Sequence, residues 1–259
     1  MRSSSSLSDS RNDVFRGFKE SLESVDRLIN LDREITQLVL TDLTNLQYKL
    51  KKAGLDNPVY NVRKTIDSIE TIRKHDSLRS RYETVTNQAL VLLVSYFGSA
   101  LSDLFRICVL IKIDADEDSD LLNEEIKLTI RELKGQDRDL RESIPDILVA
   151  QRDISFQDMG SWHRAAARYM GIKLCRDQTV NDIIAAQACR HVIVHSGSVV
   201  TERLLSQVKD AHPRKLRCEF ELGKTITFST DEISTISESM QAYISLIVDK
   251  IAALETGKL

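Results

Sequence analysis

An arginine and a histidine that could act together on a phosphodiester lie in residues 190–195, which read RHVIVH. The order is Arg190, the polar residue His191, three apolar residues and His195. A guanidinium binds phosphate oxygens as a two-pronged donor and keeps its charge at any working pH. An imidazole exchanges a proton near neutral pH. Because RNA supplies its own nucleophile, the 2′-hydroxyl, cleavage needs only a base, an acid and a group that stabilises charge. The residue types therefore indicate RNA cleavage without a metal ion.

A helix must position these residues. Apolar residues recur at helical spacing through residues 179–195, which predicts a helix. Gly197 suits the position after a helix end, so we expect this helix to end near His195. His191 and His195 are four residues apart and share a face. Arg190 and His195 are five apart and flank that face, roughly 140° apart around the helix axis.

One copy of this helix offers a divided and shallow site. Two copies that meet across a two-fold axis would place two arginines and two histidines in one cleft, and two-fold pairing is the commonest oligomer symmetry. We therefore expect a homodimer with Val192 or Val194 near its axis, and an activity that depends on dimerisation.

The stretch RHVIVHSG resembles the signature of HEPN domains: Arg, then Asn, Asp or His, three residues, and His. Residues 87–105 are similar to the first long core helix of that family and residues 199–205 to the segment after the motif, so the likeness covers roughly residues 80–255. Some relatives carry Asn where this chain has Ser196. HEPN domains include metal-independent ribonucleases of bacterial toxin–antitoxin and phage-defence systems.

The resemblance implies catalytic roles for Arg190 and His195 and a supporting or substrate-binding role for His191 and Ser196. It implies no cofactor, and as partners an RNA substrate, a second copy and a cognate antitoxin or defence protein. A non-catalytic HEPN module that binds RNA, a nucleotide or a protein stays open as an alternative. So does a plain helix end whose Arg and His side chains satisfy the last carbonyls.

Two metal sites are weaker alternatives. His191 and His195 have the spacing of helical zinc ligands, but the glutamate of a His-Glu-x-x-His motif is missing between them. A calcium loop would use Asp114, Asp116, Asp118 and Glu125 at its positions 1, 3, 5 and 12. Its sixth position holds a serine where the turn requires glycine, so a solvated acidic connection is the competing interpretation.

Composition favours long helices in a globular protein. The 259 residues include only 9 glycines and 3 prolines, and 42% of them are hydrophobic. The formal net charge is −3. This charge excludes a protein that coats nucleic acid through bulk charge, but it allows a small basic cleft.

The expected compartment is the cytoplasm. The four cysteines (Cys108, Cys175, Cys189 and Cys218) have no metal-binding spacing and are expected to be buried free thiols in a reducing environment. The N-terminus lacks the apolar run of a signal peptide. The most apolar region, residues 89–113, is interrupted by polar residues and predicts a buried helix, not a membrane span.

Three regions are expected: a disordered Ser-rich leader at 1–12, an N-terminal helical arm at 13–78, and a HEPN-like helical domain at 79–259. The arm is one long helix or a hairpin of two, and either packs on its own chain or binds a partner. The predicted fold class is all-α, a HEPN-like helical bundle with this N-terminal extension and one small C-terminal β-hairpin.

Shorter patterns complete the prediction. Helices are expected at about 121–134 and 157–171, with Pro145 near a helix start and a possible break at Gly160. Trp162 is interpreted as a core or interface anchor before a base-stacking platform. The basic patch at 212–217 could flank a cleft or form an exposed loop. Residues 217–228 predict the β-hairpin, and a capping box at Ser229 opens the last helix.

Overall fold

A computed structural model describes residues 4–74, 79–115, 121–129, 140–217 and 219–256. Within these ranges the regular structure is helical and no strand forms, so the predicted all-α class is confirmed. The helices are α1 (Ser4–Lys52), α2 (Asp56–Lys74), α3 (Arg79–Asp114), α5 (Leu140–Gln151), α6 (Met159–Ala165), the π-helical turn η2 (Ala166–Met170), α7 (Gln178–His195), α8 (Glu202–Val208) and α9 (Thr230–Glu255).

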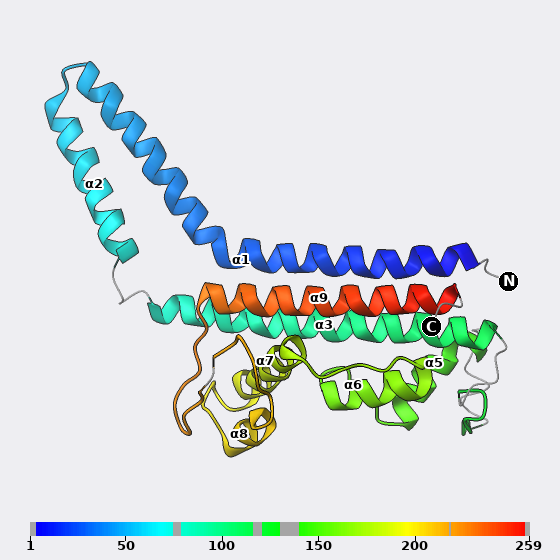
Figure 1. The fold of residues 1–259 in the computed structure, drawn as a ribbon. Helices are drawn as coiled ribbons and strands as arrows, with labels where there is room; N and C mark the ends of the chain where they lie inside the picture. Colours follow the sequence, from blue (N-terminus) through cyan, green and yellow to red (C-terminus); the bar gives the residue numbers. More distant parts are fainter. Residues whose placement is uncertain (1–3, 75–78, 116–120, 130–139, 218, 257–259) are drawn as a thin grey trace.

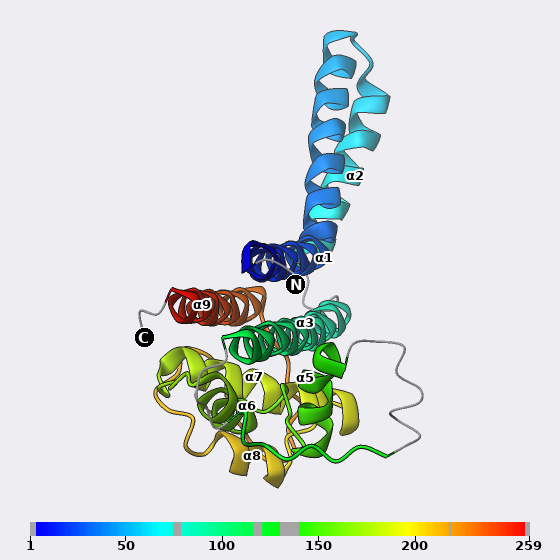
Figure 2. The ribbon, with the colours of Figure 1, turned by 90° about the vertical axis from the view of Figure 1, so that its right-hand side faces the viewer.

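The helices α3 and α9 form the middle of the body. The first part of α1 runs along one side of this pair, and the shorter helices α5 to α8 lie on the other side (Figures 1 and 2). Helix α1 runs opposite to α3 and α9 (Figure 1). Accordingly, Arg11 of α1 forms an ion pair with Glu255 at the end of α9, with an N–O distance of 2.6 Å. This ion pair thus joins α1 and α9, two helices that are far apart in the sequence.

Helix α3 carries much of the core. Its fully buried residues recur every three or four positions, which is the pattern of a helix with a continuous apolar face: Leu90, Leu93, Phe97, Leu101 and Leu104. By length and composition, residues 83–114 would also suffice to cross a membrane. However, α3 packs against α1, α7 and α9 within the bundle, which is where the core helix of a soluble protein lies.

Trp162 anchors α6 to α9. Its side chain is fully buried, and its indole nitrogen Nε1 donates a hydrogen bond to the Tyr243 hydroxyl at 2.8 Å. The His163 nitrogen Nε2 lies 3.0 Å from the same hydroxyl. Burial lowers the pKa of His163, and the positive charge of Arg176 lowers it further. The neutral imidazole can therefore accept a hydrogen bond from the Tyr243 hydroxyl. Trp162 is a core anchor, as expected, and not a surface for base stacking.

Helix α7 is fixed by buried polar side chains on its first turns. Asp177 caps its start by accepting from the Val180 amide at 2.9 Å. The buried Asp182 carboxylate accepts from the backbone amides of Lys215 and Leu216, each at 2.8 Å, and from the Ser239 hydroxyl at 3.4 Å. These bonds tie α7 to the loop before α9 and to α9 itself.

The end of α7 agrees with the sequence prediction. The helix ends at His195, and Gly197 follows with φ of 59°, in the left-handed region that glycine tolerates. The basic patch at 212–217 is less exposed than a free loop. Arg214 is buried and donates to the carbonyl oxygens of Arg217, Val208 and Ala211.

The predicted β-hairpin at 217–228 does not form among the described residues. Its backbone pairs instead with the loop that follows α7. The Val200 amide donates to the Lys224 carbonyl at 2.9 Å, and the Ile226 amide donates to the Ser198 carbonyl at 2.7 Å. These bonds use the groups that a hairpin would need for its own two halves, so only an isolated bridge remains.

The predicted helix at 121–134 is also wrong for its described part. Residues 121–129 form a turn followed by irregular chain, and 130–134 lie outside the described residues. The Lys127 amide donates to the side chain of Gln151 on α5 at 3.2 Å, so a helical bond is replaced by a tertiary one. Pro145 lies inside α5, in its second turn, and not at its start.

The helix predicted at 157–171 is present as α6 and η2. Gly160 does not break it, because this residue lies in the first turn of α6. Gly171 ends it with φ of 70°.

The arm has two parts. Phe18, Leu22 and Val25 are buried against the body, and beyond them α1 leaves the body and forms an antiparallel hairpin with α2 (Figure 1). Leu31 and Leu38 on the projecting part are more than half exposed. Helix α1 already begins at Ser4, so the segment predicted as a disordered leader is helical from that residue onward.

The cysteines only partly match the expectation of buried thiols. Cys108 and Cys189 are buried and free, and burial raises the pKa of each thiol to about 12. Cys175 is exposed, because it lies in the irregular chain before α7. Cys218 lies outside the described residues.

Replacing Tyr243 with Phe tests the buried hydrogen bonds around Trp162. The change leaves the indole N–H of Trp162 without an acceptor in the core, so we expect the free energy of unfolding to fall by about 1–3 kcal/mol. Tyr48→Phe on the exposed face of the arm is the control and should change it by less than about 0.5 kcal/mol. Urea unfolding followed by circular dichroism measures both. Equal effects in the two variants would contradict the role of the Tyr243 hydroxyl.

Candidate functional site

A polar cleft of about 440 Å³ lies beside α7. It is bounded by α3, by the segment that leads into α6, and by α8. Helix α7 contributes Gln187, Arg190 and His191. Arg176 before α7 and Arg203 on α8 complete its charged lining. The structure therefore brings part of the predicted motif to a concave surface.

The cleft is locally basic. Three guanidinium groups, those of Arg176, Arg190 and Arg203, line it together with a single carboxylate, that of Asp158. Asp158 is already engaged, because its side chain caps α6 by accepting from the Ser161 amide. The chain as a whole carries a formal net charge of −3, so the positive charge is a property of this place and not of the surface in general. Such a cleft attracts anions.

Arg176 is held in place by α7 itself. Its Nε donates to the Asn181 side-chain oxygen at 2.9 Å, and Asn181 donates in turn to the Pro213 carbonyl at 2.9 Å. The guanidinium is thus oriented by a buried amide and not left to move freely in solvent.

Two donors in the cleft lack partners. The Gln187 side chain is only 9% exposed, and its oxygen accepts from the Met159 amide at 3.2 Å. Its nitrogen Nε2 and the Arg190 nitrogen Nε are buried without a hydrogen-bond acceptor in the described parts of the chain. A buried donor without an acceptor costs about 1–3 kcal/mol. Both atoms therefore favour a ligand that brings acceptor oxygens into the cleft.

The two histidines of the motif lie together at the edge of the cleft. Their ring centroids are 4.7 Å apart, with an angle of 48° between the rings. Burial lowers the pKa of His191, and the positive charges of Arg203, His195 and Arg190 lower it further. The His191 imidazole is therefore neutral at pH 7 and can accept a proton. His195 is exposed and does not line the cleft. It therefore extends the site outward from His191.

Other predicted residues lie in different surroundings. Ser196 ends α7 through its backbone, whose amide donates to the Val192 carbonyl at 2.9 Å, and it does not line the cleft. Val192 is 1% exposed and packs inside its own chain. It therefore cannot lie at a dimer axis, as the sequence had allowed. Val194 is 45% exposed and remains available for that role.

The arrangement of the described residues does not support either of the two alternative metal sites. No group of three or more His, Cys, Asp and Glu side chains in those ranges is placed to hold a metal ion. Of the calcium-loop residues, Asp114 forms an ion pair with Arg141 and Glu125 is exposed. Asp116 and Asp118 lie outside the described residues.

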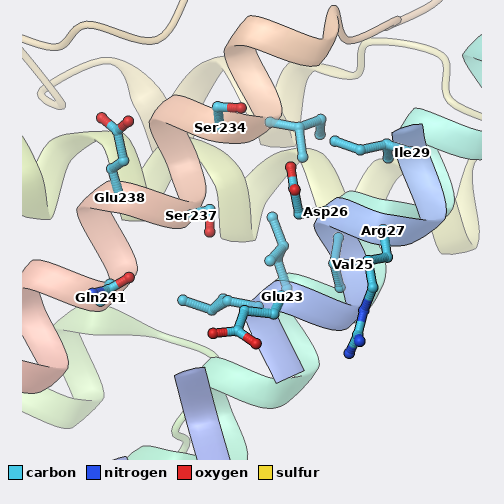
Figure 3. A pocket seen from close by; sticks show the side chains of 12 residues that line it. Glu23, Val25, Asp26, Arg27, Ile29, Ser234, Ser237, Glu238 and Gln241 are labelled. Atoms are coloured by element: carbon cyan, nitrogen blue, oxygen red, sulfur yellow. The ribbon is translucent and has the colours of Figure 1, made fainter. Parts of the chain in front are cut away.

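A second groove, of about 450 Å³, lies between α1, α3 and α9 at the base of the arm. Figure 3 shows Glu23 and Asp26 of α1 across from Ser234, Ser237 and Glu238 of α9. The carboxylates give this groove the opposite character to the cleft beside α7. It does not suit a polyanion such as RNA.

Sequence reasoning missed Gln187, Arg176 and Arg203. Gln187 carried a signal, because it is polar within the apolar run IIAAQAC and lies four residues before His191 on the same helix face. The two arginines carried none. Both reach the cleft from outside the motif helix, which only the tertiary structure reveals.

Comparisons with protein-family models, with curated proteins and with solved structures gave no significant match to the chain.

Burial is the main cause of the low pKa of His191, and the charge of Arg203 should contribute to it. Replacing Arg203 with Gln removes a positive charge that disfavours the imidazolium, so we expect the pKa of His191 to rise toward the ordinary value for histidine. NMR titration of the imidazole nitrogens measures it. Arg63→Gln on the exposed face of the arm is the matched control and should leave the titration unchanged. An unchanged pKa in Arg203→Gln would mean that this side chain does not face His191.

Proposed function

We propose that the protein is a metal-independent endoribonuclease whose site is formed by Arg190, His191 and His195. The observation that carries the proposal is the meeting of this motif with a basic cleft that contains unpartnered buried donors. The arginines supply a binding surface for phosphate oxygens, and the adjacent imidazoles supply proton transfer.

The chemistry follows from the positions of these groups. The neutral His191 accepts the proton of the RNA 2′-hydroxyl, whose oxygen then forms a bond to the neighbouring phosphorus. The bond from phosphorus to the 5′-oxygen breaks, and His195 donates a proton to that leaving oxygen. Arg190 stabilises the negative charge on the phosphorane-like transition state. The products are a 2′,3′-cyclic phosphate and a 5′-hydroxyl end.

The fold is compatible with the HEPN resemblance. A long buried helix, α3, packs beside the motif helix α7, and α9 packs against both. The motif lies at the end of α7, where its polar side chains reach the surface. We therefore propose that residues 79–259 form a HEPN-type domain and that the arm is an addition to it.

A second copy of the chain completes the proposed site. His195 lies outside the cleft at an exposed end of α7, and Val194 and Val199 provide exposed apolar surface beside it. Two-fold pairing there would cover the valines and bring the two pairs of histidines together. The arm projects from the side of the body opposite to α7 (Figures 1 and 2).

We further propose a cytoplasmic role as a toxin or anti-phage effector, restrained by a cognate partner. If the purified protein bound RNA without cutting it, the alternative of a binding module would replace this proposal.

His195→Ala and Arg190→Ala should each abolish RNA cleavage. Removing a general acid or base lowers the rate by roughly 10²–10⁴-fold, and removing the charge stabiliser should have an effect of about the same size. The measurement is cleavage of total RNA and of a labelled oligonucleotide by purified protein. Both side chains are at least partly exposed, so the variants should unfold like the wild type.

Cleavage should also survive EDTA, because the mechanism uses no metal ion. Full activity in His195→Ala, or loss of wild-type activity in EDTA with recovery on adding zinc, would contradict the mechanism.

Val194→Asp should weaken dimerisation and cleavage together. The new charge would be buried against its own symmetry mate, which is costly for an unpaired carboxylate. Leu46→Asp is the matched control, because Leu46 has nearly the same exposure (44% against 45%) but lies on the arm. Light scattering at the assay concentration measures the mass of each variant. A monomeric wild type with full activity would rule out the shared site.

A further inference from the structure

We propose that the cleft beside α7 holds a second phosphate subsite, which binds a phosphate of the RNA chain next to the one that is cut. Arg176, Arg203 and Gln187 are the residues that hold it, together with the Nε of Arg190. The identity of the ligand as RNA rests on the proposed function. The binding of a phosphate group in the cleft does not rest on the proposed function.

The donors converge from three separate elements. Gln187 and Arg190 come from α7, Arg203 from α8, and Arg176 from the chain before α7. Of these, the Gln187 side chain lines the cleft and is more than nine-tenths buried, and its nitrogen Nε2 is buried without an acceptor in the described ranges. Its orientation is fixed, because its oxygen is already bound by the Met159 amide. Folding has therefore buried a donor next to the cleft, and an acceptor oxygen of a ligand would satisfy it.

The charge and number of donors favour a phosphate. Arginine guanidiniums bind phosphate oxygens in pairs of parallel hydrogen bonds, and three of them surround this space. A carboxylate offers only two oxygens for donors that approach from several directions. The volume of about 440 Å³ exceeds that of a phosphate alone and leaves space for an attached sugar or base.

The position relative to the histidines separates this subsite from the point of cleavage. His191 lies in the lining, whereas the adjacent ring of His195 lies outside it, so one of the two proton-transfer groups is outside the cleft. The cut phosphate belongs at the edge of the cleft, between Arg190 and the two rings. The remaining donors of the lining, Gln187, Arg176 and Arg203, are then occupied by the neighbouring phosphate, which positions the chain for cleavage.

The first experiment uses inorganic phosphate and does not require any cleavage. Phosphate titrated into the wild-type protein should shift the NMR signals of the Gln187 side-chain amide and the Arg190 Nε–H. Gln187→Glu is the decisive variant, because one carboxylate oxygen can still accept from the Met159 amide while the other replaces a donor with a negative charge. We expect phosphate affinity to fall by about tenfold or more in Gln187→Glu and in Arg203→Ala. Arg63→Ala on the arm should retain it.

The second experiment measures RNA binding by the His195→Ala protein, so that the RNA stays intact. Arg203→Ala in that background should reduce the slope of log affinity against log salt by about 0.7, as expected for one phosphate contact on a single strand. Arg203→Lys should restore the slope but only part of the affinity, because it keeps the charge and loses the paired hydrogen bonds. A purely structural role for Arg203 would leave the slope unchanged.

The outcomes separate the two proposals. If the wild type binds phosphate and the variants do not, the subsite is supported even when RNA is never cleaved, and only the proposed function fails. If Gln187→Glu and Arg203→Ala keep both the phosphate affinity and the salt slope, the subsite is overturned, whether or not the protein cuts RNA.

Discussion

A single buried carboxylate holds the architecture of the site together. Asp182 is almost fully buried in α7, and a charge in that position is tolerated only when it is hydrogen-bonded on all sides. Two backbone amides and a hydroxyl, from the loop before α9 and from α9, satisfy it. Because these donors are themselves fixed in the bundle, they determine how far α7 can rotate or slide. The directions of the arginine and histidines at its other end depend on that restraint.

The cleft illustrates how a stable core and an unsatisfied site can share one helix. On the first turns of α7, the buried side chains of Asn181 and Asp182 form internal hydrogen bonds. One turn later, Gln187 uses its oxygen and leaves its nitrogen unbound. The strong hydrogen bonding of the early turns offsets the cost of leaving these later donors without protein acceptors. Buried donors without protein acceptors, at one end of a helix that is otherwise well anchored, are typical of a ligand-binding site.

Local signals in the sequence were sufficient for the end of α7 and the start of α9. Gly197 marked the end of α7, and the pairing of Ser229 with Glu232 marked the start of α9, where both halves of the capping box are present. The sequence did not show where distant segments compete for the same backbone hydrogen-bonding groups or for the same place in the core. The loop after α7 takes the backbone partners that a hairpin at 217–228 would need, and Val192 turns into the core although its spacing equally suited an interface. Arg203 belongs to the site only because that same loop folds α8 back over α7.

The projecting hairpin of α1 and α2 also changes how the molecule moves through solution. At 1.5 Å per residue, the part of α1 from Leu31 to Lys52 is roughly 30 Å long, about the diameter of a small domain. A protein with such a projecting hairpin has a larger frictional coefficient than a sphere of equal mass. It therefore sediments more slowly and elutes earlier from a gel-filtration column. A single copy would then elute with an apparent size larger than its mass implies. Retention volume is therefore a poor guide to the number of chains. Light scattering reports mass directly and does not depend on the projecting hairpin.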